Sequence, residues 1–417
     1  MAFTVAVIGL GYVGLPLATL FHENDFNVIG IDVDLNKMES LKKGISYLSD
    51  ITDADILQLT SSEKFSYSDS FQALVGADAI VLCVPTPLRN HQYPDLSYLE
   101  SAVKGMLPHL QRDQLIVLES STFPGTTEEV LVPLVESSGF IVGKDIFLGY
   151  SPERIDPGNK DYSLENIPKV ISGVTKKCLQ KTELIYSKAF RKLVPVGSPR
   201  SAEMTKILEN TQRLINISFI NEMSQLCHQL DIDIWEVIQA ASTKPYGFTP
   251  YFPGPGIGGH CIPVDPLYLK WKANLLSLET PFIDLAKKVN DNQPNYIISR
   301  TTSILKDKEH PNILLVGLTY KKDVNDVRES VSIPIFEKMI EKGWDVQYTD
   351  PFIKEYVVKG KKYQSINMTE EKISEFDVIL ILTDHSMMNY DDLIQHSKQI
   401  LDTRNCIKET YKNVIRL

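Results

Sequence analysis

The chain has 417 residues, 43% of them hydrophobic and 23% charged, which is the composition of a globular protein with two or three domains. Its 43 lysines and arginines stand against 53 aspartates and glutamates, and the net charge of −10 argues against a nucleic-acid partner. Five scattered cysteines without a C-x-x-C pair favour a reducing, cytoplasmic compartment and no metal site. The uncharged start MAFTVAVIGLGYVGLPLATLF lacks a basic segment and has glycines at a nucleotide-loop spacing, and no other apolar run approaches the ~20 residues of a membrane helix, so we expect no membrane partner.

The first part of the chain alternates buried strands with helices. A helix is expected over residues 11–23, and strands are expected at TVAVIGL (4–10), FNVIGIDVD (26–34), DAIVLCVP (78–85) and LIVLES (115–120). This rhythm is typical of a doubly wound α/β fold with a parallel sheet. We therefore predict a Rossmann domain over residues 1–199.

A helical segment follows this domain. Residues 201–230 repeat apolar side chains near a 3.6-residue period, which predicts one helix of about thirty residues. Such a long spine helix could lie between domains or across a dimer. With the helices expected up to Ser299, it forms a predicted central domain over residues 200–299.

The strand rhythm returns in the last part of the chain, predicted as a third domain over residues 300–417. The segments ILLVGLTY (313–320), DVQYTDP (345–351) and DVILILTDHS (377–386) echo the N-terminal strands in order and predict a second Rossmann-like sheet. Its first loop, GLTYKKD, lacks the second and third glycines and should not cradle a pyrophosphate in the same way. Two unrelated buried parallel sheets would also look alike, so a duplication is only one reading.

The loop Gly9, Gly11 and Gly14 follows a strand and opens a helix, which permits a tight turn and close approach of a pyrophosphate. Asp32 ends the next strand, where a carboxylate would accept both ribose hydroxyls and repel a 2′-phosphate. These features favour NAD over NADP, with FAD as the rival ligand. Thr86 and Thr122 lie in loops after later strands, where they could contact a cofactor or simply form turns.

The segment GPGIGGHCIPVDP (254–266) places Cys261 in a glycine-rich loop, directly after His260 and four residues before Asp265. The local sequence does not decide between a buried thiol and a nucleophile. Lys206 and Asn210, four residues apart on the long helix, could polarise a sugar oxygen or form part of a solvated face. A thiolate that adds to an aldehyde makes a second hydride transfer possible, so a nicotinamide site with a loop cysteine predicts a four-electron alcohol dehydrogenase.

The chain closely resembles the nucleotide-sugar 6-dehydrogenases, the UDP-glucose/GDP-mannose dehydrogenase family, almost end to end. Seven motifs in order carry the resemblance: GLGYVGLP, ESSTFPGTT, SPERIDPG, EMTKILENT, GPGIGGHCIPVDP, GLTYKKDVNDVRES and LDTRN. It implies an NAD-binding Rossmann domain, a helical dimerisation domain and a second Rossmann-like domain for UDP, and therefore a UDP-sugar substrate and a homodimer.

The resemblance also implies roles for individual residues. Cys261 would be the nucleophile, Lys206 and Asn210 would stabilise the oxyanion at C6, Asp265 would hold or activate water, and Glu153 and Thr122 would position water for thioester hydrolysis. The implied NAD contacts, besides the three glycines, are Tyr12, Val13, Asp32, Lys37, Thr86, Thr122 and Arg328. The implied substrate contacts are Glu153, Arg154, Lys206, Asn210, Tyr251, Gly258, Lys321 and Arg404.

The chain departs from the UDP-glucose branch, which usually has Gly-Gly-Ser-Cys-Phe before a Lys-Asp pair and an arginine upstream. Here Gly-Gly-His-Cys-Ile precedes Pro-Val-Asp, and TKPYGFTPYFPGPG contains no arginine. These differences resemble the branch that oxidises UDP-N-acetylglucosamine or its epimers for surface polysaccharides. The galacto and manno epimers and UDP-glucose stay open, as do a two-electron hydroxyacid-type dehydrogenase and a silent binding protein.

Overall fold

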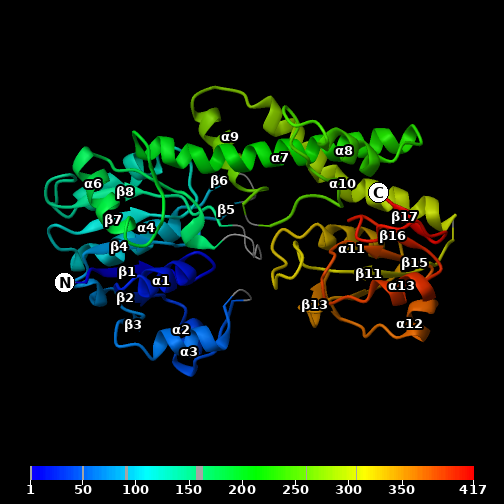
Figure 1. Cartoon of the computed structure of the whole chain (residues 1–417), viewed down its shortest axis with the longest axis horizontal. Coiled ribbons are helices and arrows are strands. Elements are labelled where there is room, and N and C mark those ends of the chain that lie inside the picture. Colours follow the sequence, from blue (N-terminus) through cyan, green and yellow to red (C-terminus); the bar gives the residue numbers. More distant parts are fainter. Residues whose placement is uncertain (1, 49–50, 90–92, 156–162, 260, 307) are drawn as a thin grey trace. The chain divides into compact units, whose positions relative to one another are not determined.

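The structure is a computed structural model that describes residues 2–48, 51–89, 93–155, 163–259, 261–306 and 308–417 (Figure 1). The chain forms two compact units: unit 1 comprises Met1–Glu209 and Val264–Glu279, and unit 2 comprises Asn210–Pro263 and Thr280–Leu417. The predicted long helix is confirmed as α7, Pro199–Gln229, a single helix of 31 residues. The boundaries of the three predicted domains remain predictions. Helix α10 (Pro281–Leu305) runs through the one placed between residues 299 and 300.

Unit 1 contains a six-stranded, wholly parallel sheet, here called the N-terminal sheet. Its strand order is β3-β2-β1-β4-β7-β8, so the chain winds outward in both directions from β1 and β4. The strands are β1 (Thr4–Ile8), β2 (Asn27–Ile31), β3 (Phe65–Ser68), β4 (Ala79–Leu82), β7 (Leu115–Leu118) and β8 (Phe147–Tyr150). The predicted doubly wound architecture is confirmed.

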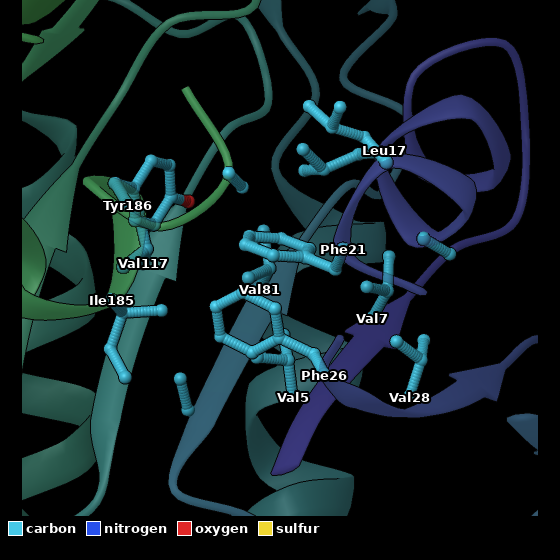
Figure 2. Close-up of a cluster of buried hydrophobic side chains, with 14 of the residues drawn as sticks. Val5, Val7, Leu17, Phe21, Phe26, Val28, Val81, Val117, Ile185 and Tyr186 are labelled. Carbon is cyan, nitrogen blue, oxygen red and sulfur yellow. The ribbon is translucent and has the colours of Figure 1, made fainter. Parts of the chain in front are cut away.

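Alternate residues of each strand face the two sides of this sheet, and both sides are buried. Val5 and Val7 of β1 pack into the cluster that contains Phe21 and Tyr186, shown in Figure 2. Ala6 and Ile8 pack into a second cluster on the opposite side. Burial on both faces explains why these strands read as continuous apolar runs in the sequence.

The remaining elements of unit 1 surround this sheet. The helices are α1 (Gly14–Glu23), α2 (Leu35–Lys43), α3 (Asp53–Thr60), α4 (Ser97–Met106), α5 (Val132–Glu136), α6 (Lys176–Tyr186) and α9 (Asp265–Leu275). Short turns of helix are η1 (Phe71–Leu74), η2 (Leu107–His109), η3 (Thr127–Leu131) and η4 (Leu164–Asn166). Two small ribbons pair β5 (Leu88–Arg89) with β6 (Tyr93–Pro94), and β9 (Lys169–Ile171) with β10 (Leu193–Pro195).

Unit 2 contains the predicted second parallel sheet, here called the C-terminal sheet. Its order is β12-β11-β15-β16-β17, and Ile313 and Leu315 pack on one side while Leu314 and Val316 pack on the other. The strands are β11 (Asn312–Val316), β12 (Asp345–Thr349), β15 (Val378–Ile381), β16 (Ile400–Asp402) and β17 (Val414–Arg416). The fold class is therefore two Rossmann-like sheets with a long central helix.

The other elements of unit 2 are mainly helical. They are α8 (Ile234–Ser242), α10, α11 (Ser332–Glu341), α12 (Glu370–Glu375), α13 (Tyr390–His396) and the hairpin of β13 (Glu355–Val358) and β14 (Lys361–Gln364). In the described parts of the chain, no helix has both the length and the apolarity needed to cross a membrane. All five cysteines are free.

Candidate active site

The three glycines of the loop after β1 have different surroundings: Gly9 and Gly14 are closely packed, and Gly11 is not. Gly9 has φ of +90°, and a Cβ built on it would lie 2.6 Å from the carbonyl oxygen of Cys83. A Cβ on Gly14 would lie 1.8 Å from the carbonyl oxygen of Gly9, whereas nothing lies within 4 Å of a Cβ on Gly11. Packing therefore requires Gly9 and Gly14, while Gly11 faces open space that a ligand can enter.

Helix α1 begins at Gly14, three residues after the predicted start. Residues Gly11–Val13 form a turn instead, the N–H of Leu15 donates to the carbonyl oxygen of Gly11 at 3.1 Å, and the positive end of the helix dipole lies at the glycine loop. Tyr12 and Val13 are half-buried in this turn. A turn followed by a helix N-terminus suits a bound pyrophosphate, as the motif predicted.

Asp32 lies one residue beyond β2 and is 6% exposed. Its Oδ2 accepts hydrogen bonds from the backbone N–H of Leu10, at 2.8 Å, and from Nζ of Lys37, at 2.7 Å. The carboxylate thus supports the glycine loop and carries a neighbouring cation. Both predicted cofactor residues, Asp32 and Lys37, are brought together.

The two threonine loops are joined to each other. Thr86 Oγ1 donates to the carbonyl oxygen of Ser121 at 2.6 Å, and the hydroxyl of Tyr268 in α9 donates to the carbonyl oxygen of Thr86. Thr122 is 1% exposed, and its hydroxyl lies close enough to the hydroxyl of the fully buried Tyr150 to interact with it. The threonine loop is therefore held against β8 as well.

These residues fit a bound NAD. The open space beside Gly11 leaves room for the pyrophosphate of a dinucleotide, and Asp32 supplies a carboxylate for the ribose. When bound, NAD supplies a hydride acceptor.

Helix α7 carries three buried polar residues at one end. Lys206 is 8% and Asn210 5% exposed, and their four-residue spacing places them on the same face of the helix. Glu203, fully buried, accepts from the backbone N–H groups of Gly125 and Thr127 and from the hydroxyl of Thr127. Glu203 therefore ties the loop of Thr122 to α7, a role that sequence reasoning missed.

A small apolar cluster joins the three segments that carry predicted site residues. Phe123, Ile207, Val264 and Tyr268 pack against one another within unit 1. Their sequence neighbours are Thr122, Lys206 and Asp265, and Asp265 is fully buried at the start of α9. Unit 1 thus gathers the threonine loop, the lysine and the aspartate.

Glu153, three residues after β8, is 4% exposed and has a fixed orientation. Its Oε1 accepts from the backbone N–H groups of Arg154 and Ile155, at 2.6 and 2.7 Å, and its Oε2 accepts from Nζ of Lys169 at 3.0 Å. Burial acts to raise the pKa of Glu153, but Lys169, Ile155 and Lys206 outweigh it, so the pKa lies below its usual value. Glu153 therefore stays ionised, with Lys206 in its electrostatic surroundings.

The side chain of Arg154 is bound by other residues of unit 1. It forms a two-pronged pair with Glu209 of α7, at 2.6 and 3.2 Å, and Nη1 donates to the carbonyl oxygen of Pro168. Arg154 thereby fastens the loop of Glu153 to α7, and its contact with substrate remains a prediction.

The glycine-rich segment before Cys261, residues 254–259, lies in unit 2 and is held by side-chain amides. The backbone N–H groups of Gly254 and Ile257 donate to Asn221 Oδ1 and Asn290 Oδ1, at 2.9 and 2.7 Å, and Gln293 Nε2 donates to the carbonyl oxygen of Gly254 at 2.8 Å. These three amides, from α7 and α10, were not predicted. Asn290 and Gln293 share an i, i+3 spacing that could have suggested a common role.

Cys261 itself is half-buried, two residues before unit 2 gives way to unit 1. His260, noted beside it in the sequence, lies outside the described residues, as do the last residues of SPERIDPG from Asp156 onward. The alignment of Cys261 with Lys206 and Asp265, which belong to unit 1, remains a prediction.

Unit 2 brings several predicted substrate residues to the C-terminal sheet. A Cβ on Gly258 would lie 2.7 Å from the carbonyl oxygen of Glu329, and one on Gly259 would lie 2.7 Å from the ring of Tyr320. Arg404 follows β16, donates from Nε to the carbonyl oxygen of Leu382 at 2.7 Å and lies beside Gly254. The glycine-rich loop therefore packs against the loops that leave this sheet.

Two of the other predicted residues of unit 2, Lys321 and Arg328, lie after β11 of the C-terminal sheet, and the third, Tyr251, lies against helices. Lys321 is half-buried in the loop after β11, and Arg328 forms a close pair with Asp326, at 2.7 Å from Nη2. Tyr251 is half-buried against Ile220, Ile234 and Ile238. The contacts of these residues with NAD or substrate remain predictions.

Comparison with known proteins gives a family for this site. Three domain descriptions of the UDP-glucose/GDP-mannose dehydrogenase family match in order: the NAD binding domain at residues 3–190, the central domain at 200–292 and the UDP binding domain at 314–409.

Individual relatives cover most of the chain. The UDP-N-acetyl-D-glucosamine 6-dehydrogenase of Pseudomonas aeruginosa is 35% identical over 84% of this chain and 83% of its own. The NDP-N-acetyl-D-galactosaminuronic acid dehydrogenase of Ralstonia nicotianae is 32% identical over 96% and 95%. A solved structure of the UDP-D-ManNAc dehydrogenase of Pyrococcus horikoshii matches with a TM-score of 0.90 and 29% identity, over 99% of this chain and 98% of that one. Together with the geometry of the glycine loop and the two sheets, these matches establish that the chain belongs to the UDP-glucose/GDP-mannose dehydrogenase family of NAD-dependent nucleotide-sugar dehydrogenases.

Proposed function

We propose that this chain oxidises the C6 hydroxyl of a UDP-N-acetylhexosamine, with UDP-N-acetylglucosamine as the first candidate, to the uronate for surface polysaccharide synthesis. The observation that carries the proposal is the chemistry named for the three relatives above, all of which act on or yield a 2-acetamido sugar although they differ in epimer. The missing arginine upstream of Gly254 separates the chain from the UDP-glucose branch in the same direction.

The chemistry takes four electrons from one carbon. Lys206 and Asn210 would stabilise negative charge on the C6 oxygen while its proton passes to the water held by Asp265, the first hydride passes to NAD and the second hydride later passes to another molecule of NAD. The Cys261 thiolate then adds to the resulting aldehyde, and loss of a second hydride from this thiohemiacetal gives a thioester. Water adds to the thioester carbonyl, the carbon–sulfur bond breaks with its electron pair on sulfur, and one water proton passes to Glu153.

The geometry of unit 1 supports these roles. Glu153 is held as an anion within the electrostatic reach of Lys206, and the loop of Thr122 is tied to the same helix by Glu203. A cation that stabilises an oxyanion and a carboxylate that accepts a proton from water are the two groups that the reaction needs.

A homodimer is also proposed. Large apolar side chains stay exposed on the helical part of unit 2, at Phe219, Leu226, Leu230, Val237 and Phe282, the last of them 74% exposed. Large apolar side chains that stay exposed on helices are common where another chain packs, and the resemblance favours a second copy.

The proposal is tested by counting NADH per UDP-sugar consumed. Two NADH and a uronate support it, whereas one NADH and a carbonyl product indicate a two-electron dehydrogenase, and no NADH indicates a silent binding protein. The assay is repeated with the gluco, galacto and manno UDP-N-acetylhexosamines and with UDP-glucose. A clear preference for UDP-glucose would refute the hexosamine assignment.

The variant Cys261→Ser isolates the nucleophile. It should bind NADH and UDP-sugar like the wild type but release no uronate, because a serine hydroxyl is a poor substitute for the thiolate. Normal uronate release would remove Cys261 from the mechanism. Cys227→Ser, another half-buried cysteine, is the matched control and should leave turnover intact.

A further inference from the structure

A buried ionic cluster lies at the carboxyl ends of β7 and β8. It consists of Glu119, Lys169 and Glu153, whose side chains are 0%, 3% and 4% exposed. Lys169 Nζ lies 2.6 Å from Glu119 Oε2 and 3.0 Å from Glu153 Oε2, so one ammonium bridges two carboxylates. Neither Glu119 nor Lys169 was singled out by the sequence.

The cluster is anchored at the end away from Glu153. The hydroxyl of Tyr186, a fully buried residue of the apolar cluster in Figure 2, donates to Glu119 Oε1 at 2.6 Å. The ring of Phe190 stacks on Tyr186 with centroids 5.6 Å apart, and Lys169 Nζ lies 5.1 Å from the Phe190 ring centre. Lys169 is therefore held by a carboxylate and an aromatic face that the protein core fixes in place.

Such a cluster is a poor way to stabilise a fold. Removing charges from water costs several kcal/mol for each ion, and a buried ion pair often contributes no more stability than apolar side chains of the same volume. Two carboxylates share one ammonium here, so the cluster holds more negative than positive charge. A role in the adjoining site explains its presence better than stability does.

The two carboxylates of the cluster are not equivalent. Burial is the main influence on Glu119 and raises its pKa, although Lys169 opposes this effect. Glu153 has the same burial, but Lys169, the backbone N–H of Ile155 and Lys206 bring its pKa below the usual value. A proton that enters the cluster therefore goes to Glu119 and leaves Glu153 as the anion.

We propose that Lys169 is a positioning residue that keeps Glu153 ionised and in one orientation, with Glu119 and Tyr186 holding Lys169 in place. A carboxylate offers about four lone-pair directions, and three on Glu153 are taken by Arg154 N–H, Ile155 N–H and Lys169 Nζ. The direction that is left on Oε2 receives the water that hydrolyses the thioester. The inference rests on the proposed function, since it assigns the support of that function's water-activating group.

The titratable groups around Glu153 predict different effects for two variants. These groups are Lys169, Lys206, Glu119, Cys83 and Tyr186, all within unit 1. Lys169→Met removes the bridging cation, so Glu153 should ionise only at higher pH. Glu119→Gln keeps an acceptor for Lys169 and resembles the protonated Glu119 that is already present when Glu153 takes up a proton, so Glu153 should ionise in the same pH range as in the wild type.

The experiment follows thioester hydrolysis in the full-length protein across pH. UDP-N-acetylglucosamine, or the epimer that the NADH assay prefers, is mixed with excess NAD, and NADH release and the mass of the Cys261 adduct on the quenched protein are recorded. Lys169→Met should still give two NADH in a fast burst, then hydrolyse about 100-fold more slowly at neutral pH, a typical general-base contribution. The adduct should accumulate, and raising the pH should restore hydrolysis.

The shift of the acid limb separates positioning from damage. Glu119→Gln and Lys169→Arg, which keeps the charge, should both leave the acid limb of the hydrolysis profile near that of the wild type, whereas Lys169→Met should move it to higher pH. If Lys169→Met does not fold, Lys169→Gln replaces it. A limb that the neutral variant leaves in place, or that Lys169→Arg moves equally far, overturns the inference. A wild type that makes one NADH and no adduct would instead refute the proposed function.

Discussion

In the N-terminal and C-terminal sheets alike, the strand that comes first in the sequence is followed directly by a glycine with φ of +90°, Gly9 after β1 and Gly317 after β11. In both sheets the N–H of this glycine donates to the last residue of the second strand, at 2.7 and 2.9 Å. In both, an aspartate one residue farther on, Asp32 or Asp350, accepts from the backbone N–H after the glycine, at 2.8 and 2.7 Å.

The surroundings of the two aspartates differ. Asp32 Oδ2 also binds Lys37, whose side chain is 28% exposed, and open space lies beside Gly11. Asp350 Oδ2 also lies 3.2 Å from Nε2 of the fully buried His385, and its Oδ1 accepts from Phe352 and Ile353 N–H. Because the N–H of Asp323 donates to His385 Nδ1, the histidine proton sits on Nε2, facing Asp350 and Thr319.

The comparison shows that the same arrangement, an aspartate bonded to the backbone N–H after the glycine, has different roles in the two sheets. In the N-terminal sheet the aspartate keeps a partner that solvent and ligand can reach, which suits recognition of a ribose. In the C-terminal sheet buried donors bind both oxygens of Asp350, so this aspartate holds the loop after β11 in place. That loop lies against the glycine-rich loop next to Cys261 through Tyr320.

The largest expected effect comes from removing the second aspartate. Asp350→Ala strands the buried His385 and several backbone N–H groups, so the free energy of unfolding should fall by about 3–5 kcal/mol. Asp32→Ala loses partly hydrated partners and should cost about 1–2 kcal/mol. Urea unfolding followed by circular dichroism measures both, and equal losses would break the distinction between the two sheets.

Gly14→Ala should come next. Its Cβ would lie 1.8 Å from the carbonyl oxygen of Gly9, so the glycine loop must move and NADH affinity should fall about 100-fold, the scale of a lost phosphate cradle. UDP affinity, which we assign to the other sheet, should not change. Fluorescence titration with NADH and calorimetry with UDP measure the two sites. Gly197→Ala, where nothing lies within 4 Å, is the control.

The pH dependence of stability should distinguish Asp350 as well. Burial acts to raise the pKa of Asp350, but His385 and the backbone N–H groups outweigh it and bring the pKa below its usual 3.8. The stabilisation by the ionised carboxylate is therefore fully present above pH 3.8 and lost as the pH falls through the lower, folded-state value. The difference in unfolding free energy between wild type and Asp350→Asn should be constant near neutrality and shrink below about pH 4.

The smallest effect is expected for Lys37→Met. A single partly exposed ion pair contributes less than about 1 kcal/mol, so the urea midpoint should hardly move. NADH affinity should fall by a few-fold, about one hydrogen bond's worth, because Asp32 loses the cation that orients it. A large loss of stability would show that Lys37 is as structural as His385.

The sequence predicted the parts of the fold that repeat a local pattern. Apolar runs gave both sheets, and the 3.6-residue period gave α7. The continuation of α10 through Pro294 was not expected, because proline usually ends or kinks a helix and only tertiary packing decides otherwise. The late start of α1 depends on a turn that glycine spacing alone does not reveal.

For the candidate site too, local patterns could be predicted from the sequence and contacts between distant residues could not. Glycines, Asp32 and the threonine loops follow directly from strand ends. The partners Glu119 and Lys169 are 50 residues apart, and Glu203 and Thr127 are 76 apart, so no periodicity links them. Arg154 was predicted as a substrate contact from its motif, and its pairing with Glu209 could not be foreseen for the same reason.

Three carboxamide side chains, those of Asn221, Asn290 and Gln293, hydrogen-bond to the backbone of the loop between Gly254 and Ile257. Carboxamides neither gain nor lose a proton in the range where proteins stay folded. These three hydrogen bonds should therefore persist across that pH range, so their loss would not be the cause of an acid or alkaline limb in the rate profile.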